Sequence, residues 1–281
     1  GRLLLKREAI APLPMSLTLP SVGLRERLVI KLADWGFIKQ DWYGFSPTLP
    51  TRCQGNSNTM QQDEIIRREI ENMLRQKIGL NPASVGSRSI LRAVKKGMRS
   101  GKLQGLSDYL DGLQASPETF EALVESVVVP ETSFFRNRAS FVFLRQWVAH
   151  EWQGERPLRV LSLPCSTGEE PYSVAITLLE EGLALDDFHI DAVDISSRAL
   201  EKAKEGVYSP YAFRRQTYRS DDKYFTLGMP EGVTQGRRIT QRYFLTETVR
   251  DKVCFHQGNV LDSGLLVDQP PYDIVFCRNL L

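Results

Sequence analysis

The sequence has few cysteines, few histidines and no long apolar run. Its four cysteines form no Cys-x-x-Cys pair and have no histidine nearby at zinc-ligand spacing, which disfavours a zinc site and a disulfide framework. No run reaches the roughly 18 apolar residues of a membrane-spanning helix, and we expect neither an anchor nor a signal peptide. These absences predict a cytoplasmic protein that keeps its thiols reduced, binds no metal and does not insert into a membrane.

The net charge of the chain is small, at +2 over 281 residues, so it does not by itself indicate a nucleic acid or a membrane as partner. A local cluster is more informative, because five basic residues recur at helical spacing near residue 90 and would share one helix face. These residues are Arg88, Arg92, Lys95, Arg99 and Lys102. Such a stripe suits docking of a long acidic partner, and a solvated helix face is the alternative explanation.

The first 130 residues divide into an N-terminal segment and a helical module. Residues 1–60 contain a proline-rich start, a short helix expected around residues 24–35 and a linker-like stretch at residues 46–59, and this pattern indicates no function. Over residues 61–130, apolar side chains recur at three- and four-residue spacing. We therefore expect a small helical domain there.

After residue 157, short apolar strands alternate with helices, which is typical of a parallel sheet with crossover helices. The expected strands cover residues 158–163, 188–193, 252–256 and 272–277. Between the second and the third lies an insertion at about residues 208–250, in which residues 223–227 and 238–245 can pair as an antiparallel ribbon. The sequence thus predicts a doubly wound α/β fold with an inserted β ribbon.

Residues 164–173, Pro-Cys-Ser-Thr-Gly-Glu-Glu-Pro-Tyr-Ser, link the first expected strand to a helix that opens at Pro171. A phosphate-binding loop needs several glycines, whereas this loop has one glycine and two acidic residues, so phosphate cofactors are disfavoured. The loop amides and the acidic side chains fit S-adenosylmethionine, which carries a carboxylate, a sulfonium and an ammonium group. A helix cap with surface glutamates is the alternative.

Polar residues also follow the other three expected strands. Asp194 ends the second strand, about 26 residues after Gly168, where an acidic side chain in such folds accepts hydrogen bonds from ribose hydroxyls. Capping of the next helix is the alternative role for Asp194. The third strand runs into residues 258–262 and the fourth into residues 277–279. Because these strand ends meet in one crevice, they predict a nucleoside-type cofactor site.

Four segments resemble the motif set of the CheR-type chemotaxis protein-glutamate methyltransferases, in the same order and at the same spacing. They are residues 132–136 (Thr-Ser-Phe-Phe-Arg), 166–173 (Ser-Thr-Gly-Glu-Glu-Pro-Tyr-Ser), 194–196 (Asp-Ile-Ser) and 276–279 (Phe-Cys-Arg-Asn). The resemblance covers roughly residues 64–281. It implies a Rossmann-like class I methyltransferase domain at residues 131–281, preceded by a helical CheR N-terminal-like domain at residues 61–130 that docks the receptor.

The resemblance implies methyl transfer from S-adenosylmethionine to glutamate side chains of a chemoreceptor cytoplasmic domain, which yields methyl esters and S-adenosylhomocysteine. A glutamate is already ionised at neutral pH and the sulfonium is an activated leaving group, so no general base is required. The histidines agree with this chemistry, since His150, His189 and His256 fall outside the motifs and are expected to be structural.

The resemblance also implies a set of cofactor-binding residues. They are Thr132, Arg136, Gly168, Glu170, Asp194, Asn259, Val260, Arg278 and Asn279. Within this set Arg136 is the candidate catalytic residue, because its fork of donors can hold the carboxylate of the cofactor or of the substrate. A surface arginine after an aromatic pair is the alternative.

The chain departs from the family pattern at two points. Pro130 stands where the family often has asparagine, which removes a side-chain contact to the cofactor. The family also continues beyond residue 281 with a tyrosine, a crossover helix and closing strands. We therefore expect a C-terminally incomplete domain with an exposed sheet edge.

Two other functions fit parts of the sequence. Residues 270–272, Pro-Pro-Tyr, resemble the Pro-Pro-aromatic motif of nucleic-acid amino-methyltransferases. They precede the fourth expected strand, whereas that motif follows it, so we expect no nucleic acid partner. The remaining hypothesis is a cofactor-binding signalling module without turnover, because an incomplete domain would leave the site unfinished.

Overall fold

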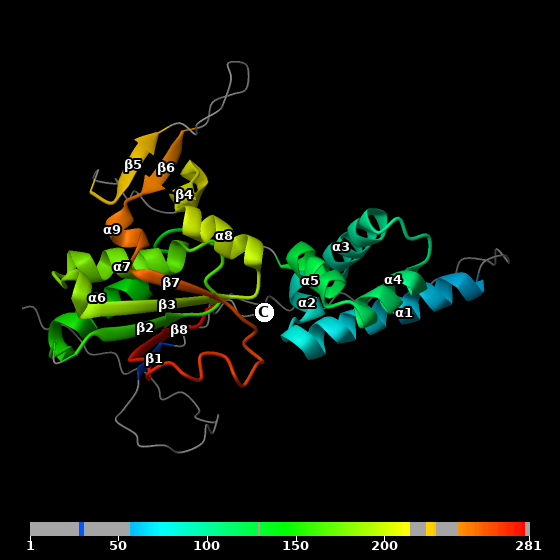
Figure 1. The fold of residues 1–281 in the computed structure, drawn as a ribbon, viewed down its shortest axis with the longest axis horizontal. Helices are drawn as coiled ribbons and strands as arrows, with labels where there is room; N and C mark the ends of the chain where they lie inside the picture. The colour runs from blue at the N-terminus through cyan, green and yellow to red at the C-terminus, as the bar shows by residue number, and fades with distance from the viewer. Residues whose placement is uncertain are drawn as a thin grey trace, which may run out of the picture.

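The computed structural model describes residues 28–30, 57–128, 130–154, 156–213, 223–228 and 241–278. Within these ranges the chain forms two bodies, a group of helices and an α/β domain (Figure 1). Each body has its own hydrophobic core. No helix in the described ranges is long and apolar enough to cross a membrane.

Side-chain caps mark the starts of two helices in the helical domain. Its helices are α1 (Ser57–Ile78), α2 (Pro82–Val85), α3 (Ser87–Ser100), α4 (Leu106–Ala115) and α5 (Pro117–Val127). At the start of α2 the Asn81 side chain accepts a hydrogen bond from the Ala83 amide, and Ser116 caps α5 through the Thr119 amide. Apolar side chains from these helices form the core: Ile70, Leu74, Ile90, Leu113 and Leu123. The small helical domain predicted from the sequence is confirmed.

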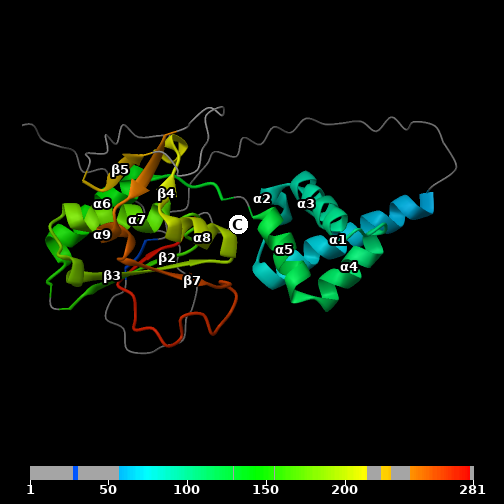
Figure 2. The ribbon, with the colours of Figure 1, turned by 45° about the horizontal axis from the view of Figure 1, so that its top comes forward.

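The α/β domain is built on a parallel sheet with the strand order β1-β8-β2-β3-β7. Its strands are β1 (Leu28–Ile30), β2 (Leu158–Ser162), β3 (Phe188–Asp194), β7 (Val253–Gln257) and β8 (Ile274–Phe276). Three helices lie along one face, and the loop between β7 and β8 lies on the other (Figure 1 and Figure 2). These helices are α6 (Arg138–Glu151), α7 (Glu169–Glu180) and α8 (Ser197–Glu205). The predicted Rossmann-like α/β fold is confirmed.

The insertion between α8 and β7 forms a small antiparallel sheet. Its strands are β4 (Val207–Tyr208), β5 (Phe225–Gly228) and β6 (Arg242–Leu245), in the order β4-β6-β5. The two ends of the insertion are adjacent, because the Leu245 amide donates to the Gly206 carbonyl at 2.9 Å. The short helix α9 (Glu247–Arg250) then leads to β7. The predicted antiparallel ribbon is confirmed, and β4 adds a strand that the sequence pattern did not indicate.

The structure corrects the expectations for the N-terminal segment and the sheet edge. Residues 28–30 form β1 and not part of the helix expected around residues 24–35, whose other residues lie outside the described ranges. β1 pairs in parallel with β8, so the edge expected to be exposed beside β8 is covered along β1. A Leu-Val-Ile strand is too short to display the two-residue period of a strand. Residues 57–59, expected in a linker, belong to α1.

Gly168 occupies the sharp turn from β2 into α7. Its φ angle is +92°, and an added Cβ would lie 2.9 Å from the Ala203 Cβ and 3.0 Å from the Tyr172 ring. Two tyrosine hydroxyls fix this packing, since Tyr172 donates to the Ala203 carbonyl and Tyr208 to the Thr167 carbonyl, each at 2.8 Å. Glycine at this position therefore lets the loop pack closely against α8.

We expect Gly168→Ala to lower the free energy of unfolding by about 2–4 kcal/mol, because it adds left-handed backbone strain and crowding. The matched control is Gly182→Ala near the other end of α7, where φ is +87° but no atom of the described residues lies within 4 Å of the added Cβ. The control should lose only about 1–2 kcal/mol, from the backbone alone. Urea denaturation measures both values, and equal losses would show that the close packing at Gly168 has no energetic weight.

Candidate functional site

A cavity of about 240 Å³ lies at the carboxyl ends of the parallel strands. Part of its wall comes from the loops that follow β2, β3 and β7, and part from the segment that precedes α6. The helical domain supplies another part, at the end of α1 and just after it: Ile78, Gly79 and Leu80. The cavity therefore depends on both bodies of the protein.

Most of the residues expected at the site come together in this cavity. Those that line it are Thr132, Arg136, Glu170, Asp194, Asn259, Val260 and Arg278. Gly168 does not line the cavity, because it is packed behind the loop against α8. Asn279 lies outside the described residues. The structure thus places seven of the nine expected residues around one space.

Asp194 ends β3 and fastens two loops at the cavity. Its Oδ2 atom accepts a hydrogen bond from the Ser166 amide at 2.7 Å, and Oδ1 accepts one from the Ser196 amide at 3.0 Å. The residue that caps α8 is Ser196, whose hydroxyl oxygen accepts from the Ala199 amide. Burial raises the pKa of the Asp194 carboxyl, and the amides of Ser196 and Ser166 oppose that rise. Asp194 is therefore not the helix cap, which was the alternative role for it.

Glu170 points from the first turn of α7 into the cavity. Its Oε1 atom accepts a hydrogen bond from the Ser162 hydroxyl at 2.8 Å, and Oε2 lies 3.5 Å from Nη1 of Arg278. Burial raises the pKa of the Glu170 carboxyl, and the Ser162 hydrogen bond and the charges of Arg278 and Arg136 oppose that rise. The alternative of a surface glutamate is wrong for Glu170, which is largely enclosed.

Arg278 is a buried arginine whose donors are only partly used. Its side chain is 2% exposed, and Nη1 donates to the Arg136 carbonyl at 2.6 Å. The Nε and Nη2 atoms are buried and have no hydrogen-bond partner among the described residues. Because unpaired buried donors are costly, this corner of the cavity favours an anionic group of a ligand.

Arg136 is placed differently from Arg278. Its side chain lines the cavity, and Nη1 donates to the Glu131 carbonyl at 2.7 Å. Arg136 also lines a second, more open groove of about 700 Å³, which shares residues 130–133 with the cavity. Arg136 therefore stands at the boundary between the enclosed cavity and the open groove.

The contribution of the helical domain was not foreseen from the sequence. The Asn259 side chain donates to the Lys77 carbonyl at 2.6 Å and accepts from the Leu261 amide at 3.1 Å, so it ties the loop after β7 to the end of α1. Gly79 follows the last residue of α1, and a glycine at such a position indicates only the end of a helix. Its approach to the cavity follows from the packing of the two bodies, which has no local signature.

Glu125 is the main polar link between the two bodies. Its carboxylate accepts hydrogen bonds from the Ser196 hydroxyl at 2.7 Å, the Ser197 hydroxyl at 3.1 Å and the Arg198 amide at 3.2 Å. A carboxylate at the amino end of α8 also interacts favourably with the positive end of the helix dipole. Beside it, Ile195 packs against the core of the helical domain. These contacts fix α5 against the loop that Asp194 holds.

The basic stripe lies on the exposed face of α3. Its exposed side chains on the helix are Arg88, Arg92, Lys95 and Arg99. The opposite face of α3 is buried in the helical core through Ile90, Ala93 and Val94. The expectation that Lys102 continues the stripe along the same helix is wrong, because Gly101 ends α3 and Lys102 follows with a φ of +52°.

The Pro-Pro-Tyr segment at residues 270–272 lies before β8, whereas the cavity lies at the carboxyl ends of the strands. Its Tyr272 hydroxyl donates to Asp191 Oδ2 at 2.8 Å. This position does not match that of the nucleic-acid amino-methyltransferase motif, which follows the corresponding strand. The nucleic-acid hypothesis therefore gains no support from the site.

Comparison of the sequence with known proteins finds methyltransferases. A family model described as "CheR methyltransferase, SAM binding domain" matches residues 130–281. Over 214 residues the chain is 44% identical to the "Probable biofilm formation methyltransferase WspC" of Pseudomonas aeruginosa. The aligned region is 75% of this chain and 48% of that protein. Over 207 residues it is 30% identical to "Chemotaxis protein methyltransferase 2" of the same species. That alignment takes in 72% of this chain and 70% of the relative.

A further relative is the "Chemotaxis protein methyltransferase" of Escherichia coli, which is 29% identical over 219 residues, or 76% of this chain and 72% of that protein. The chain spans about half the length of the WspC relatives that it matches.

We expect Glu125→Ala to lower the free energy of unfolding by about 1–3 kcal/mol, because two hydroxyls and an amide at the start of α8 lose their acceptor. Glu121→Ala is the control, since Glu121 is exposed on the same helix and accepts from Gln257 at 2.9 Å. It should change stability by less than about 0.5 kcal/mol. Chemical denaturation distinguishes the two, and a loss for Glu125→Ala no larger than that of the control would contradict the assigned link.

Proposed function

The chain belongs to the CheR methyltransferase family, and on this basis we propose that it transfers a methyl group from S-adenosylmethionine to a glutamate side chain of a chemoreceptor. The product would be a glutamate methyl ester in chemotaxis or a related signalling system. The observation that carries the proposal is the cavity around Glu170, Asp194 and Arg278, in which buried donors of Arg278 have no partner among the described residues.

The charges of the cavity suit S-adenosylmethionine. Nε and Nη2 of Arg278 would pair with the methionine carboxylate. The carboxylates of Glu170 and Asp194 suit the ammonium group and the ribose hydroxyls. Apolar side chains such as Leu80 and Ile195 offer surface for the adenine. The proposed cofactor set is completed by Thr132, Asn259 and Val260, with Gly168 shaping the loop and Asn279 following Arg278 in the chain.

The proposed reaction does not require a general base from the protein. S-adenosylmethionine supplies a methyl group that its sulfonium already activates. A glutamate has a pKa of about 4.3 and is ionised at neutral pH, so no residue has to remove a proton. In line with this, no histidine is among the described residues that line the cavity. What remains is to align the incoming carboxylate and to exclude water from it.

We assign the alignment of the substrate carboxylate to Arg136. The open groove next to the cavity is wide enough, at about 700 Å³, to admit a side chain from a partner protein. Arg136 lines both the groove and the cavity, so a carboxylate that passes from one to the other meets its guanidinium. The fork of donors on an arginine holds a carboxylate in a fixed orientation, which is what methyl transfer in line with the sulfonium requires.

The basic stripe on α3 is the proposed docking surface for the receptor. Its exposed cationic side chains face away from the helical core, and they would meet the acidic surface of the methylation helices. Docking through spread surface charges speeds encounter and weakens with salt. A cytoplasmic location follows from this proposal, because the expected substrate is the cytoplasmic domain of the receptor.

Labelled methyl transfer tests the proposed function. The protein is incubated with radiolabelled S-adenosylmethionine and either receptor cytoplasmic fragments or nucleic acid, and the label is then treated with mild base. We expect label on the receptor fragment that mild base releases, as a methyl ester requires. Label on nucleic acid would overturn the proposal, and cofactor binding without transfer would leave a signalling module without turnover as the better description.

We expect Arg278→Met to weaken S-adenosylhomocysteine binding about 10- to 100-fold, because charged hydrogen bonds to the carboxylate are lost. Arg138→Met, at an exposed position on α6, is the control and should leave the affinity unchanged. Isothermal titration calorimetry measures both constants.

Charge reversal on the stripe should act on receptor binding and not on the cofactor. We expect Arg92→Glu combined with Lys95→Glu to raise the KM for the receptor fragment about tenfold or more at low salt, and to leave the Kd for S-adenosylhomocysteine unchanged. The control combines Arg68→Glu with Arg75→Glu, two exposed positions on α1 that carry the same change in charge. An equal effect of the two double variants would mean that net charge, and not the stripe, attracts the receptor.

A further inference from the structure

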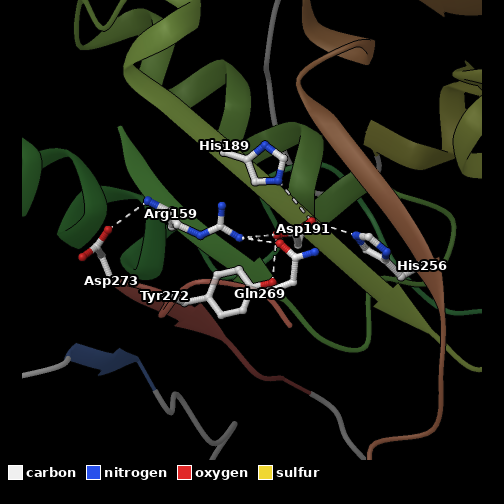
Figure 3. Close-up of polar contacts among 7 residues, drawn as sticks. All are labelled: Arg159, His189, Asp191, His256, Gln269, Tyr272 and Asp273. Carbon is white, nitrogen blue, oxygen red and sulfur yellow. Dashed lines mark hydrogen bonds and ion pairs between the residues drawn. The ribbon is translucent and has the colours of Figure 1, made fainter. Parts of the chain in front are cut away.

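Two neighbouring strands present metal-binding side chains on one face of the sheet. His189 and Asp191 alternate on β3, and Cys254 and His256 alternate on β7. β3 and β7 are parallel, and Asp191 lies opposite Cys254 in their register. The two pairs of side chains therefore project from the same face of the sheet, on which Tyr272 of the loop between β7 and β8 contacts Asp191. Figure 3 shows three of the four, His189, Asp191 and His256.

The side chains of this cluster point toward one another, as Figure 3 shows for the two imidazole rings. Nε2 of His256 lies 2.7 Å and Nε2 of His189 lies 3.1 Å from the same oxygen, Oδ1 of Asp191. One ligand atom each of His189, Asp191 and Cys254 all lie within 4.8 Å of one another. Ligand atoms around a tetrahedral zinc ion are about 3–4 Å apart, so these three atoms need to approach one another only slightly to share an ion. His256, next to the same Asp191 oxygen, is the candidate fourth ligand.

Asp191 is held from its other side by a second set of donors. Its Oδ2 atom accepts hydrogen bonds from Nη2 of Arg159 at 2.9 Å and from the Tyr272 hydroxyl at 2.8 Å. Arg159 is itself placed by a hydrogen bond to Gln269 at 3.1 Å. Outer hydrogen bonds of this kind orient a carboxylate ligand at a metal site. One oxygen of Asp191 is thereby fixed while the other faces the two imidazoles.

Asp191 is buried, whereas the other three side chains of the cluster are accessible to solvent. The Asp191 side chain is 1% exposed, whereas His189 and His256 are 37% and 33% exposed, and Cys254 is exposed. A metal ion can therefore reach the ligand atoms from solvent without unfolding of the sheet. Thiolate and imidazole ligands suit zinc-type ions, whereas magnesium and calcium prefer sites built from oxygen alone.

We propose that His189, Asp191, Cys254 and His256 form a binding site for a zinc-type transition-metal ion. The site would clamp β3 to β7 and does not depend on methyl transfer, since none of these residues lines the cofactor cavity. The proposal runs against the expectation from the sequence that the protein binds no metal, because each strand supplies only two of the ligands. Pairing of β3 with β7 is what brings the two halves together.

A zinc titration of the full chain, after treatment with a chelator, tests this site. Isothermal titration calorimetry with Zn²⁺ should give one ion per chain, and Co²⁺ in its place should give the absorption band of a cobalt-thiolate bond. Cys254→Ser should remove that band and weaken Zn²⁺ binding at least about tenfold, and His256→Gln should weaken it to a similar extent.

His150→Gln is the matched control, because His150 is exposed on α6 and lies outside the cluster; it should leave stoichiometry and affinity unchanged. Circular dichroism verifies that each variant is folded. The proposal is wrong if Zn²⁺ does not bind, or if binding survives both Cys254→Ser and His256→Gln. Binding of S-adenosylhomocysteine to the same metal-free samples reports separately on the methyltransferase proposal.

Discussion

The Asp194 carboxylate joins the two loops on which the cavity depends. One oxygen holds the Ser166 amide in the loop after β2, and the other holds the Ser196 amide in the loop after β3. The Ser196 hydroxyl in turn donates to Glu125 of the helical domain. Because these groups are buried or half-buried, breaking one link leaves a polar atom without water or partner. The floor of the cavity and its helical wall are therefore held in register by one connected set of hydrogen bonds.

The cavity gathers buried charges that the described residues balance only in part. Burial raises the pKa of both Asp194 and Glu170, so the enclosed site opposes their ionisation. Arg278 meanwhile keeps two buried nitrogen atoms unpaired among the described residues. A ligand with both cationic and anionic groups would relieve each of these costs at once. Such a ligand should then stabilise the fold in proportion to how tightly it binds.

The parts of the fold that the sequence predicted have local signals, and the parts it missed do not. The strand, loop and helix around Gly168 are encoded in one continuous segment, and so the cofactor motif could be found there. β1 is too short to show a period, and Lys102 leaves its helix because of the preceding glycine. The unpaired donors of Arg278 depend on burial, which spacing does not report. The cluster around Asp191 needs the pairing of strands far apart in sequence.

The inserted antiparallel sheet leaves and rejoins the α/β domain at one point, where the Leu245 amide meets the Gly206 carbonyl. A segment whose ends touch can gain or lose residues at its far side with little change in closure entropy, and without moving α8 or β7. The length of the inserted segment can therefore change at its far side, whereas Tyr208 in β4 is tied to the cofactor loop by its hydrogen bond to the Thr167 carbonyl. The domain thus combines a part whose geometry the cavity requires with a part whose length is free to change.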